Sequence, residues 1–305
     1  MVRVLLSCGR SFNRYLGDGS ASGCLESGEL YGRLEIDFDL GRHTEVAWNS
    51  MPWAKMDYEF VTDDFKQRHM GVVLDNSEEI SSVFTAVWPS DLVLSRVLGS
   101  ETRGALVFTY LPMVWDIRAE RAFTDINPEL LPGLRERRVS LYSLHVPWAK
   151  HREYGPSPNL ARALGVSIER AFADGVGVIG ITDAETTGQF RENVSSILGH
   201  RTKLYEYGVR EIAGRRLAVV GGHGCQVRII REIVDLGIDT YVTGVTVRNV
   251  YTKEAHEIAE RNGVNIIGGT SYSTEKFGCI SACDYFRGLG LPSVFLEDEP
   301  VFEDL

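Results

Sequence analysis

The sequence is poor in cysteine, and its few cysteines are spaced unlike those of a metal or disulfide site. Five cysteines occur in 305 residues, and no two have the Cys-x-x-Cys spacing of a zinc site or a redox motif. An odd number of widely spread cysteines is typical of reduced thiols rather than of a disulfide framework. We expect them to pack as small hydrophobic residues, with Cys279 and Cys283 on one face of a helix.

Long apolar runs and an excess of basic residues are also missing. No run approaches the roughly 20 apolar residues of a membrane-spanning helix, and the first residues lack the order of a signal peptide. The chain has 32 Lys and Arg against 42 Asp and Glu, a net charge of -10. A surface of this sign repels nucleic acid and anionic lipid. The sequence therefore predicts a cytoplasmic protein with neither nucleic acid nor membrane as a partner.

What is present favours an α/β protein of two lobes. Apolar residues make up 44% of the chain, enough for a sizeable core. From about residue 61, strand-like and helix-like segments alternate, as mostly parallel sheets covered by helices require. We predict three-layer α/β/α lobes with helices on both faces, the first formed by 56–165 plus 264–305 and the second by 166–263. Strands are expected at 71–74, 83–88, 105–111, 139–144, 176–182, 216–221, 240–243, 264–267 and 294–296, and helices at 91–98, 129–137, 159–164, 186–198, 225–236, 253–262 and 274–289.

The first 55 residues are predicted to be mostly strand and turn. Strands are expected at 2–7 and 34–40, with a glycine-rich stretch at 17–28 between them. In the second strand apolar residues alternate with Glu35, Asp37 and Asp39, so the three carboxylates would share one face. A row of carboxylates suits a cation, but it also suits a solvated face or an edge protected from pairing, which we favour.

Two candidate functional segments lie in the first predicted lobe, where strands give way to loops, the usual position of ligands in open α/β sheets. The first segment, 105–116, contains Tyr110, a potential acid, base or hydrogen-bond donor, and ends at Asp116. The second, 141–155, is dense in titratable groups. It places His145 at the end of a strand, and Trp148, Lys150 and His151 follow His145 within the segment.

Two further segments have glycine- or hydroxyl-rich turns. Residues 219–225 read Val-Val-Gly-Gly-His-Gly-Cys and include His223. This is either a tight turn or a set of backbone amides that cradles an anion at a helix start. Residues 269–275 read Gly-Thr-Ser-Tyr-Ser-Thr-Glu, and the four-residue spacing of Ser271 and Glu275 puts both on one face of a helix start.

Four pieces of the sequence, in order, resemble a known family. They are Leu-Val-Phe-Thr-Tyr-Leu-Pro at 106–112, the run at 140–155, Asp-Thr-Tyr-Val-Thr-Gly at 239–244 and Gly-Gly-Thr-Ser-Tyr-Ser-Thr-Glu-Lys-Phe at 268–277. Together they are similar to the interacting-factor-three-like family of dinuclear metal-centre proteins, often labelled GTP cyclohydrolase type-two homologs. The resemblance covers roughly 60–305 and leaves out the first 55 residues. It implies a two-lobed α/β fold, assembly into a ring-shaped homohexamer, and two metal ions in a cleft between the lobes.

The metal ligands that the resemblance implies are mostly replaced in this chain. Tyr110 and Leu111 stand where the family has two histidines, Ala149 where it has an aspartate, and Ser271 where it has a histidine. Hydroxyl and apolar side chains do not substitute for imidazole and carboxylate on a transition metal. The residues after Thr243 and Gly244 also lack the expected acidic and histidine side chains.

We therefore expect no dinuclear centre and predict no cofactor. A single divalent metal, if one binds, would have His145 and Glu275 as ligands.

Two functions fit this sequence. The first is an enzyme of hydrolase or cyclohydrolase type, which cleaves a C–N bond of a small heterocyclic or nucleotide-like molecule by acid-base chemistry in the cleft. The alternative is a non-catalytic oligomeric scaffold or ligand-binding protein. The predicted catalytic residues are His145, Glu275, Tyr110, Lys150 and His151, and the predicted substrate-binding residues are Ser271, Asp116, Trp148, Thr243 and His223.

Overall fold

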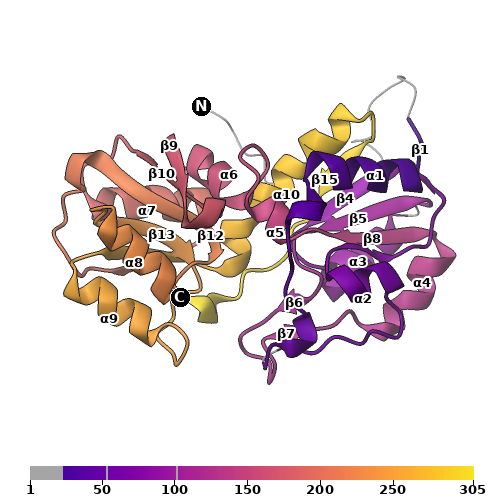
Figure 1. Cartoon of the computed structure of the whole chain (residues 1–305), viewed down its shortest axis with the longest axis horizontal. Helices are drawn as coiled ribbons and strands as arrows, with labels where there is room; N and C mark the ends of the chain where they lie inside the picture. The colour runs from indigo at the N-terminus through magenta and orange to yellow at the C-terminus, as the bar shows by residue number, and fades with distance from the viewer. Residues whose placement is uncertain (1–22, 53, 101) are drawn as a thin grey trace.

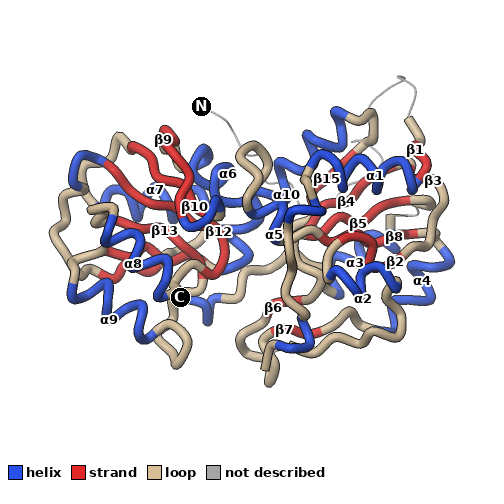
Figure 2. Tube along the Cα trace, viewed as in Figure 1, coloured by secondary structure: helices blue, strands red, loops and turns tan. Residues whose placement is uncertain are grey.

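The computed structural model describes residues 23–52, 54–100 and 102–305, and these form two α/β lobes beside each other (Figure 1). Each lobe has its own sheet, with helices packed outside the strands (Figure 2). Each strand and helix expected beyond residue 61 is present, with its ends shifted by a few residues. The strand expected at 2–7 lies outside the described residues.

The first lobe is built on five strands in the order β15-β4-β5-β8-β2. All neighbours are parallel except β2, which runs antiparallel to β8. The central strands β5 and β8 are buried along their whole length, as parallel strands covered on both faces must be. The bounds are β2 Gly71–Leu74, β4 Ser82–Ala86, β5 Ala105–Thr109, β8 Val139–Ser143 and β15 Ser293–Phe295.

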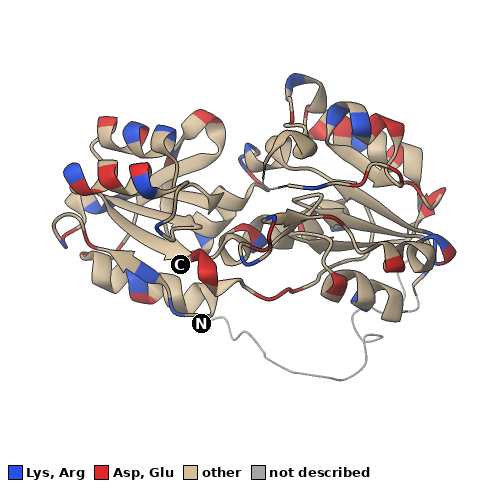
Figure 3. Ribbon diagram, turned by 90° about the horizontal axis from the view of Figure 1, so that it is seen from below, with Lys and Arg blue, Asp and Glu red and all other residues tan. Residues whose placement is uncertain are grey.

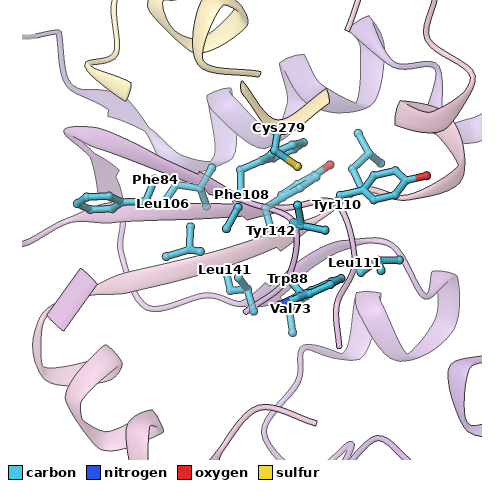
Figure 4. Packing of buried hydrophobic residues seen from close by; sticks show 14 of the residues in the cluster. Val73, Phe84, Trp88, Leu106, Phe108, Tyr110, Leu111, Leu141, Tyr142 and Cys279 are labelled. Carbon is cyan, nitrogen blue, oxygen red and sulfur yellow. The ribbon is translucent and has the colours of Figure 1, made fainter. Parts of the chain in front are cut away.

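Helices cover both faces of this sheet. Helices α1 Ser27–Asp37 and α10 Ser271–Gly288 lie on one side, and α3 Asp91–Gly99 and α4 Leu131–Glu136 on the other (Figure 1). The short helix α2 Asp63–Arg68 packs beside β2. Phe108, Tyr142 and Cys279 meet inside the apolar cluster between sheet and α10, and Tyr110 lies at one end of it (Figure 4).

The second lobe contains six strands in the order β11-β14-β13-β12-β10-β9. The inner strands β12, β13 and β14 are parallel, and the outer strands are joined antiparallel. Because β14 pairs with β13, the expectation that 264–269 belongs to the first lobe is corrected: this strand lies in the second sheet. The bounds are β9 Ser167–Phe172, β10 Gly177–Ile181, β11 Lys203–Tyr205, β12 Arg216–His223, β13 Thr240–Gly244 and β14 Asn265–Gly269.

Two helix pairs cover the second sheet. Helices α6 Pro156–Ala163 and α7 Thr187–Leu198 bury their apolar faces in one core. Helices α8 Val227–Asp235 and α9 Lys253–Arg261 bury theirs in the core on the opposite face. Helix α10 contacts strands of both sheets and therefore links the lobes. In the described part of the chain, no helix combines the length and apolarity that a membrane span requires.

The segment before the first sheet is helical where a strand was expected. Leu30, Leu34 and Phe38 are buried at four-residue spacing, whereas Ile36 is 79% exposed, so the apolar side chains follow a helix period. The predicted strand at 34–40 is therefore wrong. The three carboxylates have separate partners: Glu35 pairs with Arg68 at 2.7 Å, Asp37 accepts a hydrogen bond from the Tyr285 hydroxyl at 2.8 Å, and Asp39 pairs with Arg42 at 3.0 Å.

Two short strand pairs and a one-turn helix also belong to the described fold. Strand β1 Leu25–Glu26 pairs with β3 Glu79–Ile80, and β6 Val114–Trp115 pairs with β7 Phe123–Thr124. Helix α5 Val146–Ala149 is a single turn directly after β8. The β6–β7 pair and α5 both stand at the side of the first lobe that faces the second.

Candidate active site

A cavity of 710 Å³ lies between the two lobes, within the size range of small-molecule sites. Five of the predicted residues line it: Tyr110 after β5, His145 after β8, His223 at the end of β12, and Ser271 and Glu275 in the first turns of α10. The parallel strands β5 and β8 end at the same edge of their sheet, which brings the residues after them together. Segments more than 100 residues apart therefore converge on one cavity.

Lys150 and His151 do not line the cavity, although both were predicted as catalytic. The Lys150 ammonium binds the Asp174 carboxylate at 2.7 Å. The His151 ring stacks on Tyr154, and its Nδ1 accepts the Tyr154 backbone N–H at 3.1 Å. The turn of α5 carries both side chains away from the cavity, so the prediction that they belong to the site is corrected.

The three other predicted residues outside the cavity have structural surroundings. Trp148 is fully buried in the first-lobe core. Asp116 binds Arg118 at 2.8 Å, which holds the pKa of that carboxyl below its ordinary value. Thr243 is fully buried, and its hydroxyl donates to the Gly222 carbonyl oxygen. None of the three side chains is available to a ligand in the cavity.

His145 is paired with a carboxylate that the sequence pattern did not reveal. The Glu45 side chain is fully buried, its oxygens lie 3.2 and 3.3 Å from Nδ1 of His145, and it also accepts the Val146 backbone N–H at 3.1 Å. Burial by itself would raise the pKa of Glu45, but His145 and the backbone N–H donors hold it below its ordinary value. Glu45 lies in the first 55 residues, which the family resemblance leaves out and for which no site residue was predicted.

Glu275 is a buried acid with an unused oxygen. Burial raises its pKa to about 8, an effect that a hydrogen bond from Ser271 partly offsets, so the carboxyl is mostly protonated at neutral pH. Its Oε2 atom is buried and has no hydrogen-bond partner among the described residues. A buried polar atom without a partner is costly, and in a cavity wall it points to a ligand.

Tyr110 and His223 are two further titratable residues of the lining. The Tyr110 ring meets the His145 ring edge-on at a centroid distance of 4.9 Å, and burial raises the pKa of its hydroxyl well above the ordinary value. Burial lowers the pKa of His223, and its buried Nε2 atom has no partner in the described structure. Both groups are therefore neutral at physiological pH.

The glycine turn before α8 is a tight turn rather than an anion cradle. The amide of Gly221 donates to the Ser157 hydroxyl at 3.0 Å, that of Gly222 to the Thr274 hydroxyl at 2.9 Å, and that of Gly224 to the Thr243 hydroxyl at 3.0 Å. Because these N–H groups are already used, the turn does not offer them to a ligand.

The donor set of this cavity does not fit a dinuclear metal centre. Across the described residues, no three His, Cys, Asp or Glu side chains are grouped as metal ligands would be. The cavity positions expected to bind metal carry Tyr110, Leu111, Ala149 and Ser271, whose side chains are poor ligands for transition metals.

Comparison with known proteins supports the fold just described. Residues 62–298 match the Duf34/NIF3 (NGG1p interacting factor 3) family over more than half of the chain. The chain belongs to the Duf34/NIF3 family. The family match begins after the segment that carries Glu45, so it does not include this part of the cavity wall.

Relatives in the Duf34/NIF3 family share moderate identity with this chain. A GTP cyclohydrolase 1 type 2 homolog of Archaeoglobus fulgidus is 27% identical over 235 residues, which are 74% of this chain and 88% of the relative. A second GTP cyclohydrolase 1 type 2 homolog, from Borreliella burgdorferi, is 30% identical over 231 residues, which are 75% of this chain and 86% of the relative.

Solved structures share the fold at lower identity. The protein ybgI, described as of unknown function, has a TM-score of 0.68 at 17% identity and covers 91% of this chain and 100% of its own. Reduced HcgD from Methanocaldococcus jannaschii has a TM-score of 0.63 at 20% identity and covers 90% and 99% of the two chains.

Proposed function

We propose that this chain is an acid-base enzyme that acts on a small heterocyclic or nucleotide-like molecule in the cavity between the lobes. Hydrolysis of a C–N bond, as in a cyclohydrolase, is the reaction class that the names of its relatives suggest. The observation that carries the proposal is the pairing of the buried Glu45 carboxylate with His145, which lines a cavity of small-molecule size.

His145 is the general base in this proposal. A carboxylate beside Nδ1 favours the tautomer that holds its proton on Nδ1, which leaves Nε2 to accept a proton. His145 takes a proton from a water molecule as the water oxygen attacks the carbon of the C–N bond. The buried Glu45 carboxylate then stabilises the imidazolium ion that forms.

Glu275 and Tyr110 supply the remaining proton and hydrogen bond. The leaving nitrogen needs a proton as the C–N bond breaks, and Glu275 still holds one at neutral pH because burial raises its pKa to about 8. The Tyr110 hydroxyl stays protonated and donates a hydrogen bond to the negative charge that develops on the attacked group. After the product leaves, His145 returns its proton to solvent and Glu275 takes up one proton from solvent, which restores both groups.

The first experiment is an assay of the purified chain with GTP, with products separated by chromatography and identified by mass. We expect a product that has gained one water, and we expect His145→Gln to slow its formation about a hundredfold or more. Lys150→Met is the matched control, because Lys150 is close in sequence to His145 but outside the cavity. Equal rates for wild type and His145→Gln would refute the proposal.

A ligand-binding protein without catalysis is the second candidate, and the aromatic part of the cavity lining favours it. Trp48, Trp115 and Phe123 make one part of the lining apolar and aromatic, which suits the ring of a heterocyclic ligand whether or not a reaction follows. Saturable binding of GTP with no product, in all variants, would favour this candidate. Assembly into a ring-shaped hexamer stays a prediction, which sedimentation velocity would test.

A further inference from the structure

The lining of the cavity combines apolar and polar side chains. The first lobe and the segment before it present an aromatic wall of Trp48, Trp115 and Phe123. The second lobe presents polar side chains, among them Gln226 and Arg228, beside apolar ones. A ligand with an apolar part and a polar part suits such a lining.

Arg228 is the one Lys or Arg side chain among the residues that line this cavity. It lies in the first turn of α8 and is exposed, which places it at the mouth. Among the described residues it has no ion-pair partner. Asp174, whose pKa it helps to lower, is held by Lys150 at 2.7 Å. By contrast Arg231, on the same helix, pairs with Glu254 at 3.5 Å.

The charged side chains of the cavity lining favour an anion beside Arg228. The chain as a whole carries a net charge of -10, and acidic side chains are spread over both lobes (Figure 3). An anion therefore needs a local positive charge to approach. Glu275 is the one acidic side chain that lines the cavity, and it is mostly neutral at pH 7. The amides of Gly221, Gly222 and Gly224 in the turn before α8 are used internally, and the Arg228 guanidinium is the positively charged donor in the lining.

We infer that the ligand of this cavity carries a phosphate or carboxylate group that the Arg228 guanidinium binds, while its heterocycle packs against the aromatic wall. The guanidinium is suited to this role because its N–H groups bind two oxygens of such an anion at once. The inference rests on the proposed function and adds to it the charge and the orientation of the ligand.

The test compares pairs of probes that differ only in an anionic group. Guanosine with guanosine 5′-monophosphate tests phosphate, and nicotinamide with nicotinate tests carboxylate. Dissociation constants are measured by titration calorimetry for wild type, Arg228→Gln and Arg231→Gln. Arg231→Gln is the matched control, because it removes the same charge from the same helix at a residue that does not line the cavity.

In wild type we expect the anionic member of one pair to bind about three- to tenfold more tightly, a modest factor because Arg228 is exposed to solvent. The pair that shows the preference identifies phosphate or carboxylate. Arg228→Gln should abolish the preference, Arg231→Gln should keep it, and high salt should weaken it.

Equal binding of neutral and anionic probes, or a preference that survives Arg228→Gln, would overturn the inference while leaving the proposed function standing. Absence of binding by all four probes would count against both.

Discussion

The Glu45 carboxylate lies 3.2 Å from Nδ1 of His145, although the two residues are 100 positions apart. Glu45 precedes the region 62–298 that matches the Duf34/NIF3 family, whereas His145 lies within it. The same preceding segment adds Val46, Trp48 and Met51 to the cavity lining. A part of the chain that precedes the residues matched by the family model thus completes the candidate site and supplies the partner of its histidine.

Replacing Glu45 with Gln should weaken both the fold and the site. The variant loses the hydrogen bonds that a charged carboxylate makes to His145 and Val146, which are worth about 1.5–3 kcal/mol to stability. The pKa of Glu45 is lower in the folded protein than in the unfolded chain. Its contribution is therefore present at neutral pH and lost as the pH falls through the folded-state pKa.

Urea denaturation at several pH values measures how Glu45→Gln changes the free energy of unfolding. The difference between wild type and Glu45→Gln should be largest near pH 7 and shrink in acid. Glu29→Gln, which removes an exposed carboxylate paired with Arg33, should change stability by less than about 1 kcal/mol. A Glu45→Gln variant as stable as wild type at pH 7 would show that the pair contributes nothing.

Glu275 should make the protein less stable as the pH rises from about 5 to 8. Its pKa is raised to about 8 in the folded protein, so the folded state binds more protons than the unfolded chain in this interval. The slope is at most about 1.4 kcal/mol per pH unit.

Glu275→Gln removes this titration, so its stability relative to wild type should increase across the same interval. Parallel stability curves for wild type and Glu275→Gln would contradict the raised pKa. Glu254→Gln, at an exposed position on α9, is the control and should follow wild type.

The sequence predicts the elements of both sheets because strand and helix patterns alternate clearly there. It fails at 34–40, where apolar residues at every second position also continue the four-residue spacing of Leu30, Leu34 and Phe38. Burial decides between the two periods, and burial depends on contacts with distant parts of the chain. For the same reason the site prediction finds His145 but not Glu45, because no local spacing links residues 100 positions apart. Lys150 and His151 are overpredicted because the turn of α5 redirects them.

Gly222 should not tolerate a side chain. It has φ +83°, a conformation that L-residues rarely adopt, and an added Cβ would overlap the Glu275 carboxylate. Gly222→Ala should therefore destabilise the protein by about 3 kcal/mol or more. Gly237→Ala is the control, because Gly237 has φ +65° but open space around it, and it should cost only about 1 kcal/mol.

A double-mutant cycle isolates the contact between Gly222 and Glu275. Adding Glu275→Ala should recover part of the stability that Gly222→Ala loses, since it removes the overlapping carboxylate. Strictly additive effects of the two substitutions, measured by denaturation at pH 7, would mean that backbone conformation alone makes Gly222 necessary.

The Asp304 carboxylate binds two residues that line the cavity, Ser271 and Trp115. Asp304 is fully buried, and its carboxylate accepts the Ser271 backbone N–H at 2.8 Å and the Trp115 indole N–H at 3.0 Å. Asp304→Ala leaves both donors without a partner, which should cost about 2–4 kcal/mol and weaken binding of a ligand that contacts Trp115. Glu303→Ala, at the exposed neighbouring position, should leave stability and binding nearly unchanged.

The substitution Asp304→Asn keeps the size of the side chain but removes its negative charge. It keeps one acceptor for Trp115 or Ser271 but turns an amide N–H₂ toward the other donor, so Asp304→Asn should be destabilised less than Asp304→Ala at pH 7. Burial raises the pKa of Asp304 to about 6, above its unfolded value. The wild-type side chain therefore contributes more stability as the pH falls from about 6 to 4, and the deficit of Asp304→Asn should grow over that range. A deficit that instead shrinks in acid would mean that the Asp304 carboxylate is ionised at these pH values in the folded protein.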